Sequence, residues 1–251
     1  MSPIPWWQNV TPHADVREGR IDESLFAASL EGAVRGTAPD EYSKAEVFFR
    51  KTYLTEGLRS LLTKLLRHVA GVAAANPVAT LQTSFGGGKT HTELAIYHLL
   101  EHSDESLKVD QVRELVEAAG LSRPPACRIV VMSGVDINPL GRKTGEGLHI
   151  RTMWGEMAYQ LGGAAAFAMV AANDEKLVSP GVADLTRLLD AYGPAVILMD
   201  ETLHYVDKVS QLVGVSGNLA DNTVAFLREM TDAVRTAPRN MMVVSLTASS
   251  L

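Results

Sequence analysis

The amino-acid sequence predicts an α/β fold, in which a parallel sheet is covered by helices on both faces. Short, almost continuously apolar segments alternate with helical segments from residue 78 onward. Strands of this kind are buried on both faces, as in parallel sheets with crossover helices. A glycine-rich turn also separates the first of these strands from the next helix. A phosphate-binding loop occupies this position in such folds.

The composition limits the classes of protein and partner. The chain has 251 residues, 46% of them hydrophobic, and a net charge of −6. This length suits one large α/β domain with an extension. The acidic balance argues against tight, sequence-independent binding of nucleic acid, which needs clustered basic residues. Cys127 is the only cysteine, which excludes a disulfide framework and a cysteine-based zinc site and suits a reducing cytoplasm.

Neither a signal peptide nor a membrane span is expected. Residues 1–7 lack the basic and apolar regions of a signal peptide. The most apolar later stretch, 162–172, is well short of the roughly 18 apolar residues of a spanning helix. We therefore expect a cytoplasmic protein with no membrane partner.

Residues 1–75 are predicted to form a mostly helical N-terminal extension. A short helix is expected at 24–34, and an aromatic cluster follows at 42–53. So many large apolar residues indicate a segment that packs on the main domain rather than a free tail. Leucines and a valine then recur at helical spacing over 58–69, with basic residues opposite, which predicts an amphipathic helix.

Residues 76–251 are predicted to form the main domain. The expected strands lie at 78–82, 128–132, 195–199 and 240–246. The expected helices lie at 89–101, 113–119, 152–172, 184–192 and 219–237. Between the second strand and the third helix, residues 134–150 show no periodicity and are expected to be a long loop.

The glycine-rich turn has the features of a P-loop. Glycines allow successive backbone N–H groups to surround phosphate oxygens, and the following helix adds its positive N-terminus. We expect Lys89 to reach the β- and γ-phosphates and the Thr90 hydroxyl to coordinate Mg²⁺. The predicted nucleotide-binding residues are Phe85, Gly86, Gly87, Gly88, Lys89, Thr90 and His91. The consensus opens with glycine where this chain has Thr83, and an incidental glycine-rich turn is the alternative.

An acidic pair completes the predicted site. Asp200 and Glu201 follow the apolar strand at 195–199, as in a Walker B segment. Asp200 is expected to hold Mg²⁺, and Glu201 to polarise the water that attacks the γ-phosphate. Together with the glycine-rich turn, the pair predicts binding of ATP, or GTP, with Mg²⁺, and Glu201 favours hydrolysis by water. A charged turn after a buried strand is the alternative.

The last strand ends in polar residues that are candidates for a sensor of the γ-phosphate. In P-loop ATPases with an additional strand between the P-loop strand and the acidic strand, such a residue positions the attacking water. Thr247 is the first candidate for this catalytic role, and Ser245 and Ser249 are the alternates. A polar strand end without a function is an equal alternative.

Two weaker patterns each have a plain structural interpretation. His98 and His102 have the i, i+4 spacing of metal ligands, but two histidines on a solvated helix face are the more common case. Arg142 and Lys143 could contact a polyanion, but a solvated loop is favoured.

Several segments resemble the N-terminal part of a family of large prokaryotic AAA-type ATPases classed as a domain of unknown function. They are Pro5-Trp6-Trp7, His13-Ala14-Asp15-Val16, Phe26-Ala27-Ala28, Ala38-Pro39-Asp40-Glu41-Tyr42 and the runs 48–55, 82–91 and 151–163. The resemblance covers essentially the whole chain, and a threonine at the position of Thr83 is typical of the family. It implies an additional-strand, AAA-like core of five parallel strands in the order 5-1-4-3-2, followed by a helical lid. Counted on that order, the chain ends after the fourth strand, so we expect a fragment with weak turnover.

The resemblance also implies a wider role. Members of the family are encoded beside DNA methyltransferases in phage-defence gene clusters. This implies an ATP-driven component of a DNA-directed defence system, with DNA reached through a larger complex with a methyltransferase. It also implies a homo-oligomer of the full-length protein. The alternative function is a nucleotide-gated scaffold or switch that binds ATP with little turnover.

Overall fold

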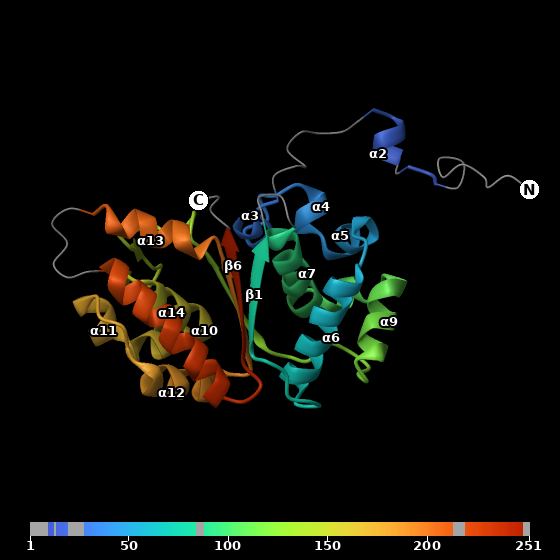
Figure 1. Ribbon diagram of the computed structural model, residues 1–251. Helices are drawn as coiled ribbons and strands as arrows, with labels where there is room; N and C mark the ends of the chain where they lie inside the picture. The colour runs from blue at the N-terminus through green and yellow to red at the C-terminus, as the bar shows by residue number, and fades with distance from the viewer. Residues whose placement is uncertain (1–9, 13, 20–27, 84–87, 213–218, 248–251) are drawn as a thin grey trace, which may run out of the picture.

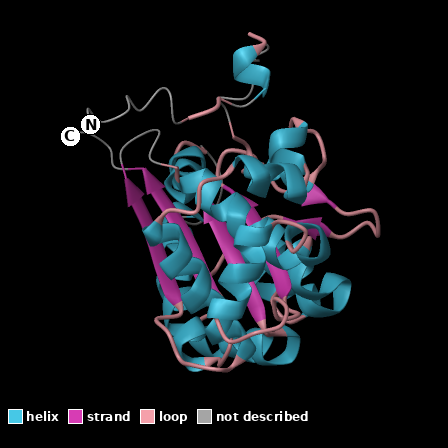
Figure 2. Ribbon diagram, turned by 90° about the vertical axis from the view of Figure 1, so that its right-hand side faces the viewer, coloured by secondary structure: helices cyan, strands magenta, loops and turns pink. Residues whose placement is uncertain are grey.

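The fold is built on a four-stranded parallel sheet. The computed structural model describes residues 10–12, 14–19, 28–83, 88–212 and 219–247. The sheet has the strand order β1-β6-β5-β2, and all three pairings are parallel. Its strands are β1 (Val78–Thr83), β2 (Arg128–Ser133), β5 (Ala195–Asp200) and β6 (Met241–Thr247). Figure 2 shows the four strands running in the same direction with helices around them. The predicted α/β class with a parallel sheet is confirmed.

The register of the strands brings their carboxyl ends to one edge. Ser133 at the end of β2 is the partner of Asp200 at the end of β5. Thr83 at the end of β1 is the partner of Thr247 at the end of β6. The strand β6 separates β1 from β5, as the additional strand was expected to do. Segments that follow β1, β5 and β2 therefore start from the same edge of the sheet.

One face of the sheet is covered by helices of the second half of the chain (Figure 1). They are α10 (Met153–Ala168), α11 (Ala171–Lys176), α12 (Val182–Tyr192), α13 (Thr202–Ser210) and α14 (Leu219–Thr236). The apolar side chains of α10, α12, α13 and α14 form one buried cluster with the facing side chains of the sheet. Trp154 and Phe226, whose ring centroids are 5.8 Å apart, lie in this cluster.

The other face is covered by helices from the first half of the chain (Figure 1). They are α3 (Leu30–Val34), α4 (Asp40–Ser43), α5 (Ala45–Lys51), α6 (Glu56–Ala70), α7 (Lys89–Glu101), α8 (Ser103–Ser106) and α9 (Asp110–Ala118). Before them, α2 (Ala14–Arg17) is a single turn. Phe48, Phe49 and Leu66 share one buried cluster with Leu94 of α7 and Val196 of the sheet. Helices α5 and α6 of the predicted extension thus pack on α7 and the sheet.

The amphipathic helix α6 is confirmed with well-defined ends. The Thr55 side chain caps its first turn by accepting the N–H of Leu58 at 3.3 Å. Gly71 ends it in the left-handed conformation, at φ 76°, which glycine adopts without strain.

Two local predictions were wrong. The expected loop at 134–150 contains an antiparallel hairpin of β3 (Arg142–Lys143) and β4 (His149–Ile150). The expected single helix at 152–172 is interrupted, since Gly162 and Gly163 have non-helical backbone angles within α10. Of the helix expected at 24–34, the structure shows α3, which begins at Leu30. Residues 20–27 lie outside the described residues.

Within the described ranges, no helix combines the length and apolar character needed to cross a membrane.

Candidate functional site

The carboxyl edge of the sheet brings the two predicted motifs together. Thr90, in the first turn of α7, donates a hydrogen bond from its Oγ1 to Oδ2 of Asp200 at 2.9 Å. The two residues are 110 positions apart in the chain. They meet because β1 leads into α7 and β5 leads into α13 at the same edge of one parallel sheet.

The start of α7 depends on a glycine. Gly88 stands at its N-cap with φ 73° and ψ 19°, the left-handed region, where other residues are strained. Its carbonyl accepts both the N–H and the Oγ1 hydroxyl of Thr92, each at 2.9 Å. Lys89 and Thr90 therefore stand at the N-terminus of a 13-residue helix, where backbone N–H groups and the helix dipole favour an anion. Phe85, Gly86 and Gly87 lie outside the described residues, so their role stays a prediction.

Asp200 is held by two hydroxyl groups. It is 7% exposed at the end of β5. Thr90 donates to its Oδ2, and the Ser245 hydroxyl of β6 donates to its Oδ1. Both oxygens are thus oriented by neighbouring elements.

Glu201 adopts an unusual backbone conformation. It has φ 47° and ψ 41°, the left-handed region, and a residue other than glycine is held there only by its surroundings. The Glu201 N–H donates to Oγ of Ser245 at 2.9 Å. On the other side, a Cβ atom on Gly134 would clash with the Glu201 carbonyl oxygen, so this close approach requires glycine. The turn after β5 is therefore fixed from both β6 and β2.

Ser245, one of the alternate candidates for the sensor, contacts both acidic residues. It is fully buried, donates to Asp200 and accepts from the backbone of Glu201. It was an alternate candidate in the sequence analysis. The side chain of the first candidate, Thr247, lies outside the described part of the chain, although its backbone pairs with Thr83. Ser249 also lies outside the described residues.

The His91 ring contacts the N-terminal helices. Its Nε2 lies 2.9 Å from Oγ1 of Thr52, and its ring centroid is 4.6 Å from that of Phe48. Burial lowers the pKa of His91. With the side chain engaged there, its backbone N–H is the group that a ligand at the start of α7 could use.

A buried carboxyl group, Glu93, was missed by the sequence analysis. It is completely buried one turn after Thr90 and lies next to Asp200, where the charges of Glu201 and Lys89 also act on it. Neither of its oxygens has a hydrogen-bond partner within the described residues. Burial, and after it the Asp200 charge, raises the pKa of Glu93 well above its usual range. The available signal was a charged residue three positions after Thr90, next to the apolar run 94–97.

The site contains the donors that suit Mg²⁺. This ion prefers oxygen ligands and is usually bound through one or two carboxylates, water and substrate phosphates. The Thr90 hydroxyl and the Asp200 carboxylate supply oxygens of this kind, and the Glu93 carboxyl group lies beside Asp200. Within the described residues, no three His, Cys, Asp or Glu side chains are grouped closely enough to hold a metal ion.

The histidine pair does not lie on a solvated face. His98 is fully buried, and its Nε2 lies 2.8 Å from the carbonyl oxygen of Tyr42. Burial lowers the pKa of His98 to about 4. The expectation of a solvated face was wrong for His98, because α4 and α5 cover this side of α7. The spacing of apolar residues within α7 does not show that these helices pack there.

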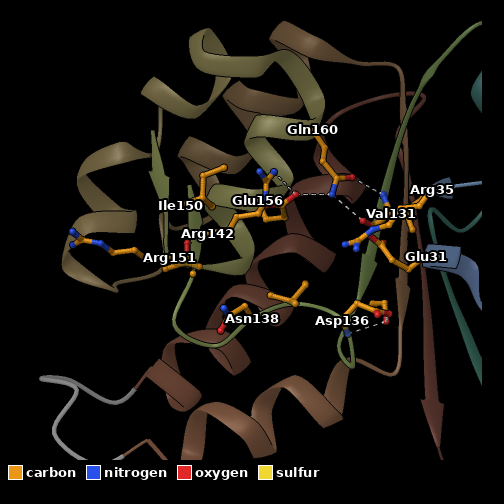
Figure 3. Close-up of a pocket in the computed structure, with 14 residues that line it drawn as sticks. Glu31, Arg35, Val131, Asp136, Asn138, Arg142, Ile150, Arg151, Glu156 and Gln160 are labelled. Carbon is orange, nitrogen blue, oxygen red and sulfur yellow. Dashed lines mark hydrogen bonds and ion pairs between the residues drawn. The ribbon is translucent and has the colours of Figure 1, made fainter. Parts of the chain in front are cut away.

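The hairpin is bonded to α10 beside a cavity of about 250 Å³ (Figure 3). Arg142 forms a bidentate ion pair with Glu156, at 2.7 and 3.0 Å. Glu156 also accepts from Gln160, whose amide bonds both backbone groups of Val131 in the edge strand β2. Arg142 is therefore engaged with α10 rather than free in a solvated loop, whereas Lys143 is exposed.

Comparison with known proteins identifies a family. The family model of the DUF499 N-terminal domain matches residues 8–250. No curated protein and no solved structure matches the chain. Because the match covers nearly the whole sequence, the chain belongs to the family of the DUF499 N-terminal domain.

Proposed function

We propose that the chain is a P-loop ATPase, which binds ATP with Mg²⁺ and hydrolyses it with water. The observation that supports this most is the 2.9 Å hydrogen bond between the Thr90 hydroxyl and the Asp200 carboxylate. It joins the helix after the glycines to the acidic end of β5. The strand order, with β6 between β1 and β5, supports the additional-strand, AAA-like form of this fold.

Each residue has a role that follows from its place. The glycine backbone and the start of α7 would bind phosphate oxygens, and the Lys89 ammonium would pair with the β- and γ-phosphates. Thr90 and Asp200 would hold Mg²⁺, which supplies charge neutralisation on the phosphates. Glu201 would accept the proton of the attacking water. Ser245 would orient both acidic residues, since it contacts the Asp200 side chain and the Glu201 backbone.

Phosphate release from ATP tests this function. We expect release that requires Mg²⁺, stops in EDTA and is lost in Asp200→Asn. Equal release by the wild type and by Asp200→Asn would contradict the proposal. If the chain binds Mg·ATP and releases no phosphate even in a single-turnover assay, the nucleotide-gated scaffold or switch replaces the ATPase.

The wider role we propose is that of an ATP-driven component of a DNA-directed defence system that acts with a methyltransferase. Its support is the sequence resemblance alone. A DNA-linked ATPase is expected to release phosphate faster when duplex DNA and the methyltransferase are added. An unchanged rate contradicts this wider role and leaves the ATPase proposal standing.

A further inference from the structure

The buried carboxyl of Glu93 lies against a second carboxyl group, that of Asp200. Its side chain is 0% exposed and neither oxygen has a hydrogen-bond partner in the described part of the chain. A buried, unpaired carboxylate is strongly destabilising, so natural proteins pair it or place it against a cation. An apolar residue at this position would fill the same space without that penalty.

The surroundings of Glu93 are the proposed ATP site. Three charged groups act on it: the carboxylates of Asp200 and Glu201, and the ammonium of Lys89. Thr90 and Glu93 are three positions apart in α7 and share one face of the helix. Thr90 bonds Asp200 directly, so Glu93 and Thr90 approach the same carboxylate.

The chemistry of this group of atoms fits one class of ligand. Hydroxyl and carboxylate oxygens converge from α7, β5 and β6, where Ser245 bonds Asp200. Such hard oxygen donors suit Mg²⁺ or Mn²⁺, whereas zinc favours histidine and cysteine. A divalent cation beside two carboxyl groups would also remove the repulsion between them.

We infer that Glu93 is the second carboxylate of the divalent cation site, acting with Thr90 and Asp200. The inference rests on the proposed function and extends it, because a P-loop and an acidic strand by themselves supply only one carboxylate ligand. The cation would then bind to the protein more tightly than a site with Asp200 alone allows. Glu93 would contribute to this affinity directly or through a cation-bound water.

Binding of Mn²⁺ followed by electron paramagnetic resonance, with and without ATP, tests the inference. Glu93→Gln removes the charge and keeps the size, so we expect Mn²⁺ affinity to fall by about 10–100-fold, the range for supporting groups at metal sites. Glu93→Asp should retain part of the affinity. The matched control is Glu101→Gln, at an exposed position of the same helix, which should bind Mn²⁺ like the wild type.

The outcomes separate the two proposals. Equal Mn²⁺ affinity in Glu93→Gln and the wild type overturns the inference. It leaves the proposal of ATP binding standing, because glutamine keeps the size and shape of the side chain at this position. A wild type that binds neither ATP nor Mn·ATP overturns the proposed function instead. If Glu93→Gln does not fold, Glu93→Asp decides: Mn²⁺ affinity weaker than that of the wild type supports a carboxylate ligand, and affinity equal to that of the wild type contradicts it.

Discussion

At the scale of single residues, Asp200 organises the candidate site. It accepts hydrogen bonds from Thr90 and Ser245 and lies beside Glu93. Glu201, the next residue, is held in a left-handed backbone conformation by Ser245 and by the approach of β2. Strained backbone of this kind is characteristic of functional positions, and its place beside Asp200 agrees with a catalytic role.

The first prediction at this scale concerns Glu201→Gln. The amide keeps the shape of the side chain but cannot accept a proton, so ATP binding should persist while kcat falls by about 10²–10⁴. Calorimetry and phosphate release measure the two quantities. A collapse of ATP affinity with an unchanged fold would make Glu201 a metal ligand rather than a base.

Sequence motifs predicted some of these residues and not others. Lys89, Thr90 and Asp200 follow a glycine-rich turn and an apolar strand, and this spacing has a direct physical meaning. Glu93 is part of no motif, and its role follows from burial next to Asp200. Ser245 could be distinguished from the polar residues after it only by the register of β6 against β5, which the structure supplies.

At the scale of elements, the turns at the carboxyl edge set the geometry of the site. The segment after β2 touches the turn after β5, where the Gly134 N–H donates to the Asp200 carbonyl at 2.8 Å. The element boundaries of α6, α7 and the four strands were predictable because caps and apolar runs are local signals. The hairpin of β3 and β4 could not be predicted, because a strand of two residues is too short to show an alternating pattern.

Gly134→Ala is predicted to disturb this turn. An added Cβ would collide with the Glu201 carbonyl oxygen, so we expect a loss of about 1–3 kcal/mol in the free energy of unfolding, and weaker phosphate release. Gly145→Ala is the matched control in the same segment, since a Cβ there meets nothing within 4 Å. Chemical denaturation measures both, and equal stabilities of the two variants would refute the close approach.

His98 in α7 is predicted to make the free energy of unfolding depend on pH. Burial is the main cause that lowers its pKa from 6.5 to about 4. The hydrogen bond to the Tyr42 backbone and the charge of Glu105 raise this pKa, and the charge of His102 lowers it. His98 therefore binds a proton below about pH 6.5 in the unfolded chain, but only below about pH 4 in the folded chain.

The stabilising contribution of neutral His98 is present above pH 6.5 and is lost as the pH falls toward 4. Over that window the slope is at most about 1.4 kcal/mol per pH unit. His98→Gln keeps a donor for Tyr42 but does not titrate, so its stability should fall less between pH 7 and pH 5. Parallel denaturation curves for the two proteins across this range would show that His98 is not the source.

At the scale of the whole molecule, the N-terminal helices and the sheet share one apolar core. Phe48 and Leu66 lie before residue 75, and Leu94 and Val196 lie after it, yet all four belong to one buried cluster. The parallel sheet was predictable from the alternation of strands and helices. The packing positions of α3, α4 and α5 could not be predicted, because short helices show little periodicity and their contacts are distant in sequence.

Phe48→Ala is predicted to destabilise the whole fold. The ring is 1% exposed and packs against His91 and His98 of α7, and its loss should lower the free energy of unfolding by about 3–5 kcal/mol. Tyr53→Ala, at a side chain that is 83% exposed, should change it by about 0.5 kcal/mol or less. A single transition that shifts in Phe48→Ala supports one cooperative unit, whereas separate transitions would contradict the shared core.

The central claim is that the start of α7 binds the phosphates of ATP, and calorimetric titration of Lys89→Ala tests it most directly. Loss of the ammonium removes hydrogen bonds to charged phosphate oxygens, each of which contributes about 1.5–3 kcal/mol. We predict Mg·ATP affinity at least about tenfold weaker than in the wild type, with an unchanged unfolding transition. Lys64→Ala, on the exposed side of α6, is the control and should bind Mg·ATP like the wild type. Equal affinity of Lys89→Ala and the wild type would contradict the account.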